Sequence, residues 1–467
     1  MAKRIFFEIT NGIDERTIDM KIQRVQFEKL FGFFDYVIDF HENITIIHGP
    51  NGCGKTTMLK IIDAVFNQKL EVLKTTDFQS VEFSFSNETI LEIERKPASL
   101  GLKSERVGGI IYLAYTIIED GHEQKFDSFE KSDEYITLIK KFLRSYRPFP
   151  FLEKISDDIW YDRKNDSNLT IEEVIAQYGP MIYKRYGREL FEDDIPEAVQ
   201  VLLQKIDVRL ITADRLTVQK KVENRYGEDS MKIDRRVNVI ASNVSQKIRE
   251  AIQEYAQLSQ AKDRTFPLRA IKQNSPMTVD EIKEKMIQLE IKRKEFIDTG
   301  ILEEEKDDID IHELLNAITE NNRQNLSLYA IDTEEKLNAL SSLSSSINLF
   351  RNLIDHSFNN KKIVFNKDFG FRFITTYSGT TILPQNLSSG EQHELVMFYD
   401  LIFNTSENTL ILIDEPELSL HIKWQINYVD ELLSIIKTTG FYAVLATHSP
   451  QIIHDKWNLT VSLSSVD

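Results

Sequence analysis

A glycine-rich loop constrains this chain more than any other feature of its sequence. Residues 49–57 read Gly-Pro-Asn-Gly-Cys-Gly-Lys-Thr-Thr and match the pattern G-x-x-x-x-G-K-[ST] at every fixed position. Residues 44–48 before the loop form an apolar run typical of a buried strand, and the apolar residues from Met58 to Phe66 have helical spacing. This order predicts a phosphate-binding loop, because backbone N–H groups and a helix N-terminus then face one anion.

The loop also predicts how its side chains hold a nucleotide and a metal ion. We expect Lys55 to reach the β- and γ-phosphates of ATP and the Thr56 hydroxyl to ligate Mg²⁺. The other predicted ATP-binding residues of the loop are Asn51, Gly52, Cys53, Gly54 and Thr57. A chance glycine-rich turn is the alternative, and the strand and helix that flank the loop argue against it.

A second segment ends in two carboxylates. Residues 410–413 read Leu-Ile-Leu-Ile, as in a buried strand, and Asp414 and Glu415 follow. Taken alone, this pattern also describes an apolar strand that runs into a polar loop. Together with the phosphate-binding loop, it predicts that Asp414 helps to hold Mg²⁺ and that Glu415 orients or deprotonates the attacking water.

Two further segments are informative through their order. Residues 387–392 read Leu-Ser-Ser-Gly-Glu-Gln at the start of a predicted helix, and residues 447–450 read Thr-His-Ser-Pro after another buried strand. Each has a simple structural explanation, with Ser388 or Ser389 as a helix N-cap and His448 as a histidine at a strand end. Their positions before and after the Asp-Glu strand add information that neither segment gives alone.

The order of these four motifs resembles that of an ABC-type ATPase head, and in particular the SMC-like heads of AAA proteins. The motif sequences are also similar to those of the ATPase subunits of the bacterial anti-phage systems Septu and PARIS. The resemblance covers residues 20–96, 207–220 and 362–455 most strongly. It implies an α/β fold, an ABC-type ATPase head with helical insertions, and an enzyme that hydrolyses ATP with Mg²⁺.

The resemblance also implies roles for individual residues. Glu415 corresponds to the catalytic glutamate and His448 to the switch histidine. Ser388, Ser389 and Gly390 correspond to the ATP-binding signature segment, in which Ser388 and Gly390 contact the γ-phosphate held by the opposite protomer. Ser389 replaces the usual glycine of transporters and Glu391 the usual glutamine, which argues against transport.

The residue of the Q-loop is less clearly marked. Gln219 follows the predicted strand at 208–213 and is the first candidate. Arg215 is the alternative, and Gln79 lies too early in the chain.

The resemblance implies partners as well. Two heads would sandwich two ATP molecules, which predicts a homo-oligomer. A separate nuclease of the HNH or TOPRIM type would be the effector, since the 467 − 450 = 17 residues after Pro450 leave no room for a C-terminal nuclease domain. The alternative function is an SMC-like DNA-repair or chromosome-structure ATPase, which would need long coiled coils or strong DNA binding.

Composition limits the kinds of partner. The sequence has 74 acidic and 57 basic residues, and a net charge of −17 opposes direct adhesion to DNA, so we expect any DNA contact to be indirect. Basic groups at 140–147 and 220–221 are the candidate exceptions. The single cysteine excludes a disulfide framework. No apolar run approaches a membrane span and no signal peptide is recognisable, so we expect a cytoplasmic protein without a membrane partner.

These patterns divide the chain into five parts. The predicted parts are lobe I of the head at 1–99, a mixed insertion at 100–206, a return to the head with the Q-loop at 207–235, a helical insertion at 236–360, and lobe II with the signature, Walker B and switch histidine at 361–467. One further pattern, Asp77 with Glu94-Arg95-Lys96, mimics a nuclease site. A strand hairpin explains it better, because such spacings are frequent in strands.

Overall fold

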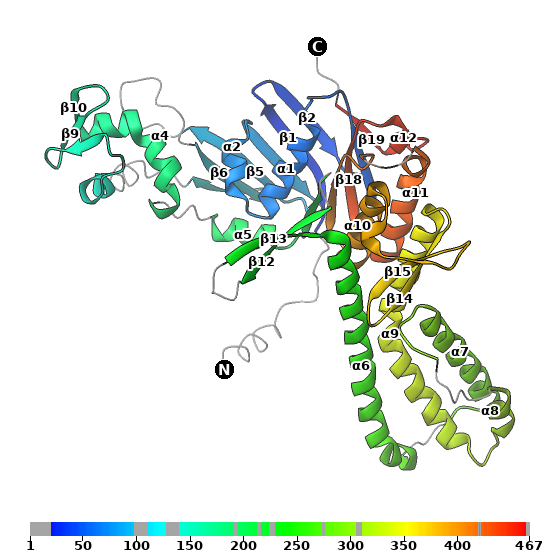
Figure 1. Cartoon of the computed structure of the whole chain (residues 1–467). Coiled ribbons are helices and arrows are strands. Elements are labelled where there is room, and N and C mark those ends of the chain that lie inside the picture. Colours follow the sequence, from blue (N-terminus) through cyan, green and yellow to red (C-terminus); the bar gives the residue numbers. More distant parts are fainter. Residues whose placement is uncertain are drawn as a thin grey trace. The chain divides into compact units, whose positions relative to one another are not determined.

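The computed structural model describes residues 20–97, 111–127, 140–190, 195–212, 216–223, 229–272, 276–304, 311–418, 420 and 422–463 (Figure 1). The chain divides into two compact units. The first comprises Met1–Leu210, Glu407–Glu415 and Gly440–Asp467, and the second Ile211–Ser406 and Pro416–Thr439. The alternative Q-loop residue Arg215 lies outside the described residues.

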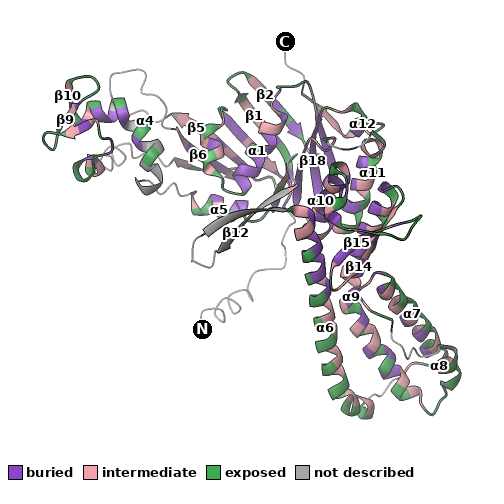
Figure 2. Ribbon diagram, viewed as in Figure 1, coloured by how far each residue is buried: buried purple, intermediate pink, exposed green. Residues whose placement is uncertain are grey.

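A largely buried parallel sheet forms the centre of the first unit. Its strands, in spatial order, are β11 (Val208–Ile211), β17 (Leu410–Asp414), β18 (Tyr442–Thr447), β3 (Ile44–His48) and β19 (Thr460–Ser462). Every residue of β17 and β18 is buried, which explains their continuous apolar sequences. Figure 2 shows the buried residues gathered along β18 and the neighbouring helix α1 (Lys55–Phe66).

A second, antiparallel sheet packs into the same apolar core. Its strands, in spatial order, are β2 (Phe34–Asp39), β1 (Ile22–Leu30), β4 (Ser80–Phe85), β5 (Ile90–Pro97), β6 (Ile111–Glu119) and β7 (His122–Asp127). The strand hairpin expected around Glu94 is therefore present as β4 and β5. β6 and β7 extend this sheet, although their sequence lies within the predicted insertion at 100–206.

Residues 140–190 form a small module with its own core. It contains a three-stranded sheet of β10 (Ser167–Thr170), β9 (Ile159–Asp162) and β8 (Leu152–Lys154). Helix α4 (Ile171–Leu190) packs against β9 and β10. The core of the module contains Trp160 and Tyr178. The first unit also contains two short helices, α2 (Leu70–Thr75) and α5 (Glu197–Leu203).

Long helices dominate the second unit. α6 (Arg236–Lys272) has 37 residues and is about 55 Å long, and α9 (Arg323–Ser357) has 35 residues. The two helices are antiparallel, because Arg269 near the end of α6 forms an ion pair with Asp332 near the start of α9. α7 (Val279–Asp298) packs against α9, and α8 (Ile311–Ala317) packs against α7. Both α6 and α9 lie within residues 236–360, where a helical insertion is predicted.

The second unit also contains helix α10 (Ser389–Phe403), at whose start the predicted signature segment lies. The other elements are the hairpin of β12 (Thr217–Glu223) and β13 (Asp229–Arg235), the strands β14 (Lys361–Asn366), β15 (Gly370–Thr375) and β16 (Thr381–Ile382), and helix α11 (Ile422–Thr439). In the part of the chain that the structure describes, no helix has the length and apolar character needed to cross a bilayer.

Candidate functional site

The register of the parallel sheet brings three of the four motifs to one edge. Asp414 at the end of β17 lies opposite Ala446 of β18, and Thr447 of β18 lies opposite His48 of β3. The residues that follow each strand therefore emerge side by side. These are Glu415 after β17, His448 after β18 and the phosphate-binding loop after β3. All of them belong to the first unit.

Glycines give the loop its shape. Gly52 and Gly54 have φ angles of 84° and 93°, in the left-handed region that disfavours other residues. A Cβ atom at Gly54 would also lie 2.8 Å from Leu30 Cδ2 and 3.2 Å from the Phe31 ring. Gly54 directly precedes the first turn of α1, so the loop delivers Lys55 and Thr56 to the helix N-terminus, where an anion is favoured.

Two pairs of side chains connect the loop to the neighbouring strands. The Thr56 hydroxyl donates to Asp414 Oδ1 at 2.9 Å. Lys55 Nζ lies 3.1 Å from His448 Nδ1. Thus the residues predicted to hold Mg²⁺ are in contact, and the residue predicted to hold the phosphates is in contact with the predicted switch histidine.

Glu415 is held by its backbone at the same edge. Its N–H donates to the Ala446 carbonyl at 2.9 Å, and its φ angle of 45° is unusual for a residue with a side chain. Its Oε1 lies 3.8 Å from His448 Nε2. A positive φ angle persists where the surrounding structure fixes it. At Glu415 this backbone conformation accompanies a carboxylate that lines a cavity.

That cavity has a volume of about 330 Å³ and contains most of the predicted nucleotide-site residues of this unit. It is lined by Phe31, Asn51, Gly52, Gly54, Lys55, Thr56, Thr57, Glu415 and His448. Cys53 instead points away into a buried position beside Lys55, 3.6 Å from its Nζ. Phe31 is the residue that the sequence analysis missed, because it lies in the turn after β1, far from the loop in sequence.

The oxygen pair of Thr56 and Asp414 suits Mg²⁺, which prefers hard oxygen ligands. In the described ranges, no group of three or more His, Cys, Asp or Glu side chains could hold a metal ion. Magnesium is usually bound through one or two protein oxygens together with phosphate oxygens and waters. The residues present therefore fit Mg²⁺ that arrives with a nucleotide, and do not form an all-protein metal cage.

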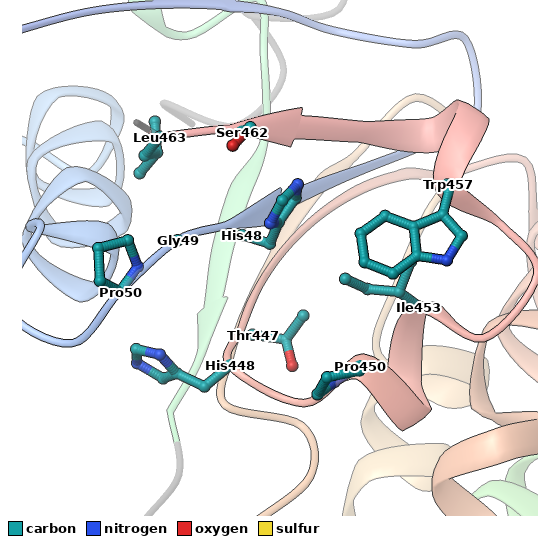
Figure 3. A pocket seen from close by; sticks show the side chains of 10 residues that line it. All are labelled: His48, Gly49, Pro50, Thr447, His448, Pro450, Ile453, Trp457, Ser462 and Leu463. Atoms are coloured by element: carbon teal, nitrogen blue, oxygen red, sulfur yellow. The ribbon is translucent and has the colours of Figure 1, made fainter. Parts of the chain in front are cut away.

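A second cavity lies beside the first and shares His448 with it (Figure 3). Its volume is about 370 Å³, and its walls include His48 and Trp457, whose rings meet edge to face at 5.5 Å. Gly49, the first residue of the phosphate-binding loop, also lines this cavity. It packs so closely against Leu463 that a Cβ atom at this position would lie 2.9 Å from the Leu463 carbonyl oxygen.

The predicted signature segment, residues 388–390, lies in the second unit. Ser388 is the N-cap of α10 and forms a capping box with Glu391. Its structural role as a helix N-cap is therefore confirmed. Glu391 also forms an ion pair with Lys361, which gives a structural reason for a glutamate at this position. Gln219 lies within β12, paired in register with Ile233, also in the second unit.

The other candidate sites have structural explanations. Arg95 forms an ion pair with Asp77 at 3.0 Å, so the nuclease-like pattern is part of a salt-bridged sheet. Three of the four basic residues at 140–147 also form ion pairs. The pairs are Lys140 with Glu172, Arg144 with Asp158, and Arg147 with Glu153. These pairs leave less positive charge for DNA than the sequence suggests.

Comparisons with known proteins identify the family of the chain. Residues 20–453 match the AAA ATPase domain family AAA_15. Among solved structures, the Smc head domain of Pyrococcus furiosus with an extended coiled coil and bound ScpA domain has 11% identity and a TM-score of 0.34, with 96% of this chain and 94% of that chain covered. The SMC head domain from Thermotoga maritima has 10% identity and a TM-score of 0.33, with 96% of both chains covered. A search of curated proteins finds no match.

The two structural similarities are too low to carry an argument about function. The family match is different, since it spans most of the sequence and includes the loop, both carboxylates and the histidine. It agrees with the α/β fold. The chain therefore belongs to the AAA ATPase domain family and is an ATPase.

Proposed function

We propose that the chain is the ATP-binding and ATP-hydrolysing regulatory subunit of an anti-phage defence complex and controls a separate nuclease. The ATPase part of this proposal rests on the convergence of Lys55, Thr56, Asp414 and Glu415 around one cavity. The defence part rests on the similarity of its motifs to those of the Septu and PARIS ATPases.

In this proposal each side chain at the strand edge has a distinct task. Lys55 and the loop backbone bind the phosphates, Thr56 and Asp414 hold Mg²⁺, and Glu415 orients or deprotonates the attacking water. Phe31, at the edge of the cavity, offers an aromatic face to the nucleobase. Mg²⁺ supplies charge neutralisation at the phosphates when it is bound.

The signature segment then completes the site across a homo-oligomer. Its residues Ser388, Ser389 and Gly390 lie at the start of α10, where Ser388 and Ser389 are exposed. A helix N-terminus with exposed serine hydroxyls suits a γ-phosphate presented by a second protomer. We assign the nuclease contact to the insertions, which add surface that nucleotide binding does not require.

The test is to co-express the chain with the product of the neighbouring gene, purify any complex and measure nuclease activity over a range of ATP concentrations. We expect a stable complex whose nuclease activity depends on nucleotide. A tenfold change in partner affinity needs only about 1.4 kcal/mol of coupling. Activity that ignores nucleotide, or no complex at all, would contradict the defence role while leaving ATP hydrolysis untouched.

A second candidate function is an SMC-like DNA-repair or chromosome-structure ATPase. The long antiparallel helices α6 and α9 favour it, because this function would need long coiled coils. The ion-paired basic residues at 140–147 and the net charge of −17 weigh against DNA binding. Tight, salt-dependent DNA binding by the chain alone would favour this second function.

A further inference from the structure

Lys55 is enclosed by acceptors. Its side chain is almost completely buried, and its Nζ lies 2.9 Å from the Gly49 carbonyl oxygen, 3.0 Å from the Pro50 carbonyl oxygen and 3.1 Å from His448 Nδ1. A lysine ammonium carries three hydrogens and no lone pair. The three acceptors therefore match its three hydrogens, and Cys53 Sγ at 3.6 Å is a weaker fourth contact.

This contact determines which nitrogen of His448 carries the ring hydrogen. The ammonium of Lys55 can only donate, so Nδ1 must present its lone pair. A neutral imidazole with a lone pair on Nδ1 carries its hydrogen on Nε2, and a doubly protonated ring would direct N–H against N–H. Figure 3 shows the His448 ring beside Gly49 and Pro50, the other partners of Lys55.

The opposite side of the same ring faces the predicted catalytic carboxylate. His448 Nε2 lies 3.8 Å from Glu415 Oε1, which is longer than a hydrogen bond but close enough for attraction. The backbone of Glu415 is fixed by its bond to Ala446, so a small movement of the ring changes this distance. A hydrogen on Nε2 attracts the carboxylate, whereas a lone pair there would repel it.

We infer that Lys55 is a positioning residue for His448: it fixes the tautomer with hydrogen on Nε2 and so directs that N–H toward Glu415. The inference rests on the proposed roles of Lys55 and Glu415 and deepens them. Phosphate oxygens are charged and accept from an ammonium more strongly than a neutral imidazole does. Phosphates that engage Lys55 therefore weaken its bond to Nδ1, and His448 transmits this change to Glu415.

The test is ¹⁵N NMR of the full-length chain with ¹⁵N-labelled histidine. The sequence has nine histidines, and His448→Gln assigns the resonances of interest. In the wild-type chain we expect an unprotonated Nδ1 and a protonated Nε2 on His448. Lys55→Met has a similar length but no donor, and should raise the population of the tautomer with hydrogen on Nδ1. His48, which lines the adjacent cavity, is the internal control and should keep its spectrum.

The wild-type spectrum alone can overturn the inference. Hydrogen on Nδ1 of His448 in the wild-type chain would do so, as would an unchanged tautomer in a folded Lys55→Met chain. A third measurement adds Mg-ATP to Glu415→Gln, and we expect the His448 resonances to move. Failure to bind ATP in this measurement would contradict the proposed nucleotide site, whereas the tautomer of the nucleotide-free wild-type chain tests the inference separately.

Discussion

Lys55 is the residue on which the nucleotide site most depends. Its replacement by alanine removes a charged contact to the phosphates, and such contacts contribute about 1.5–3 kcal/mol. We therefore expect Lys55→Ala to weaken ATP binding by roughly tenfold to a hundredfold. Titration calorimetry with ATP and Mg²⁺ measures this change. Lys60→Ala, at an exposed position of the same helix, is the matched control and should bind ATP like the wild-type chain.

Glu415 allows binding to be separated from hydrolysis. Glu415→Gln keeps the size of the side chain but cannot accept a proton from water, and general-base catalysis contributes about 10²–10⁴-fold. We expect ATP affinity to remain close to that of the wild-type chain while phosphate release falls by about 10²-fold or more. Glu42→Gln, at an exposed position before β3, is the control. Wild-type turnover in Glu415→Gln would show that another residue activates the water.

At the scale of single elements, α10 contains a buried acid that the ATPase chemistry does not use. Glu394 is only 1% exposed. Burial raises the pKa of Glu394 from 4.5 to about 8, the Ser357 hydroxyl opposes this change, and the carboxylates of Glu431 and Glu391 add to it. Burial likewise raises the pKa of Glu431 on α11 to about 7, with a contribution from Asp430.

These carboxyl groups predict a stability that decreases with pH. The folded chain binds the Glu394 proton more tightly than the unfolded chain, so the stability from this group is complete below about pH 4.5 and is lost as pH rises through 8. Each pKa unit corresponds to about 1.4 kcal/mol. We expect Glu394→Gln to raise the melting temperature at pH 8 and to have little effect at pH 5.

Thermal melts at several pH values check this expectation, with Glu254→Gln at an exposed position of α6 as the control. The same decline with pH in Glu394→Gln and in the wild-type chain would show that Glu394 is not its source. The signature segment begins the same helix, so this pH dependence belongs to an element that the proposed ATP site uses.

The elements also show what the sequence could predict. Buried strands and their motif residues were predictable, because parallel strands such as β17 and β18 read as continuous apolar runs. The lengths of α6 and α9 could not be predicted from apolar spacing. The outer half of α6 has few buried residues and is joined to α9 by ion pairs such as Arg269–Asp332. Phe31 was missed for a similar reason, because only the tertiary fold brings the turn after β1 to the loop.

At the scale of the whole molecule, the proposed site needs two protomers. The resemblance to ABC-type heads assigns the γ-phosphate contact of Ser388 and Gly390 to a second copy of the chain, and the loop and both carboxylates to the first. ATP would then act as the link between two heads, and dimerisation should depend on nucleotide that is bound but not hydrolysed.

Glu415→Gln gives the material for this last prediction. We expect the variant to be mainly monomeric without nucleotide and to double its mass with Mg-ATP, as measured by light scattering after size-exclusion chromatography. Adding Ser389→Arg places a long side chain at the exposed start of α10, keeps the Ser388 cap, and should prevent dimerisation. Ser345→Arg, at an exposed position of α9, should not. A dimer that forms without ATP, or that tolerates Ser389→Arg, would place the interface elsewhere and remove the reason for a signature segment at residues 388–390.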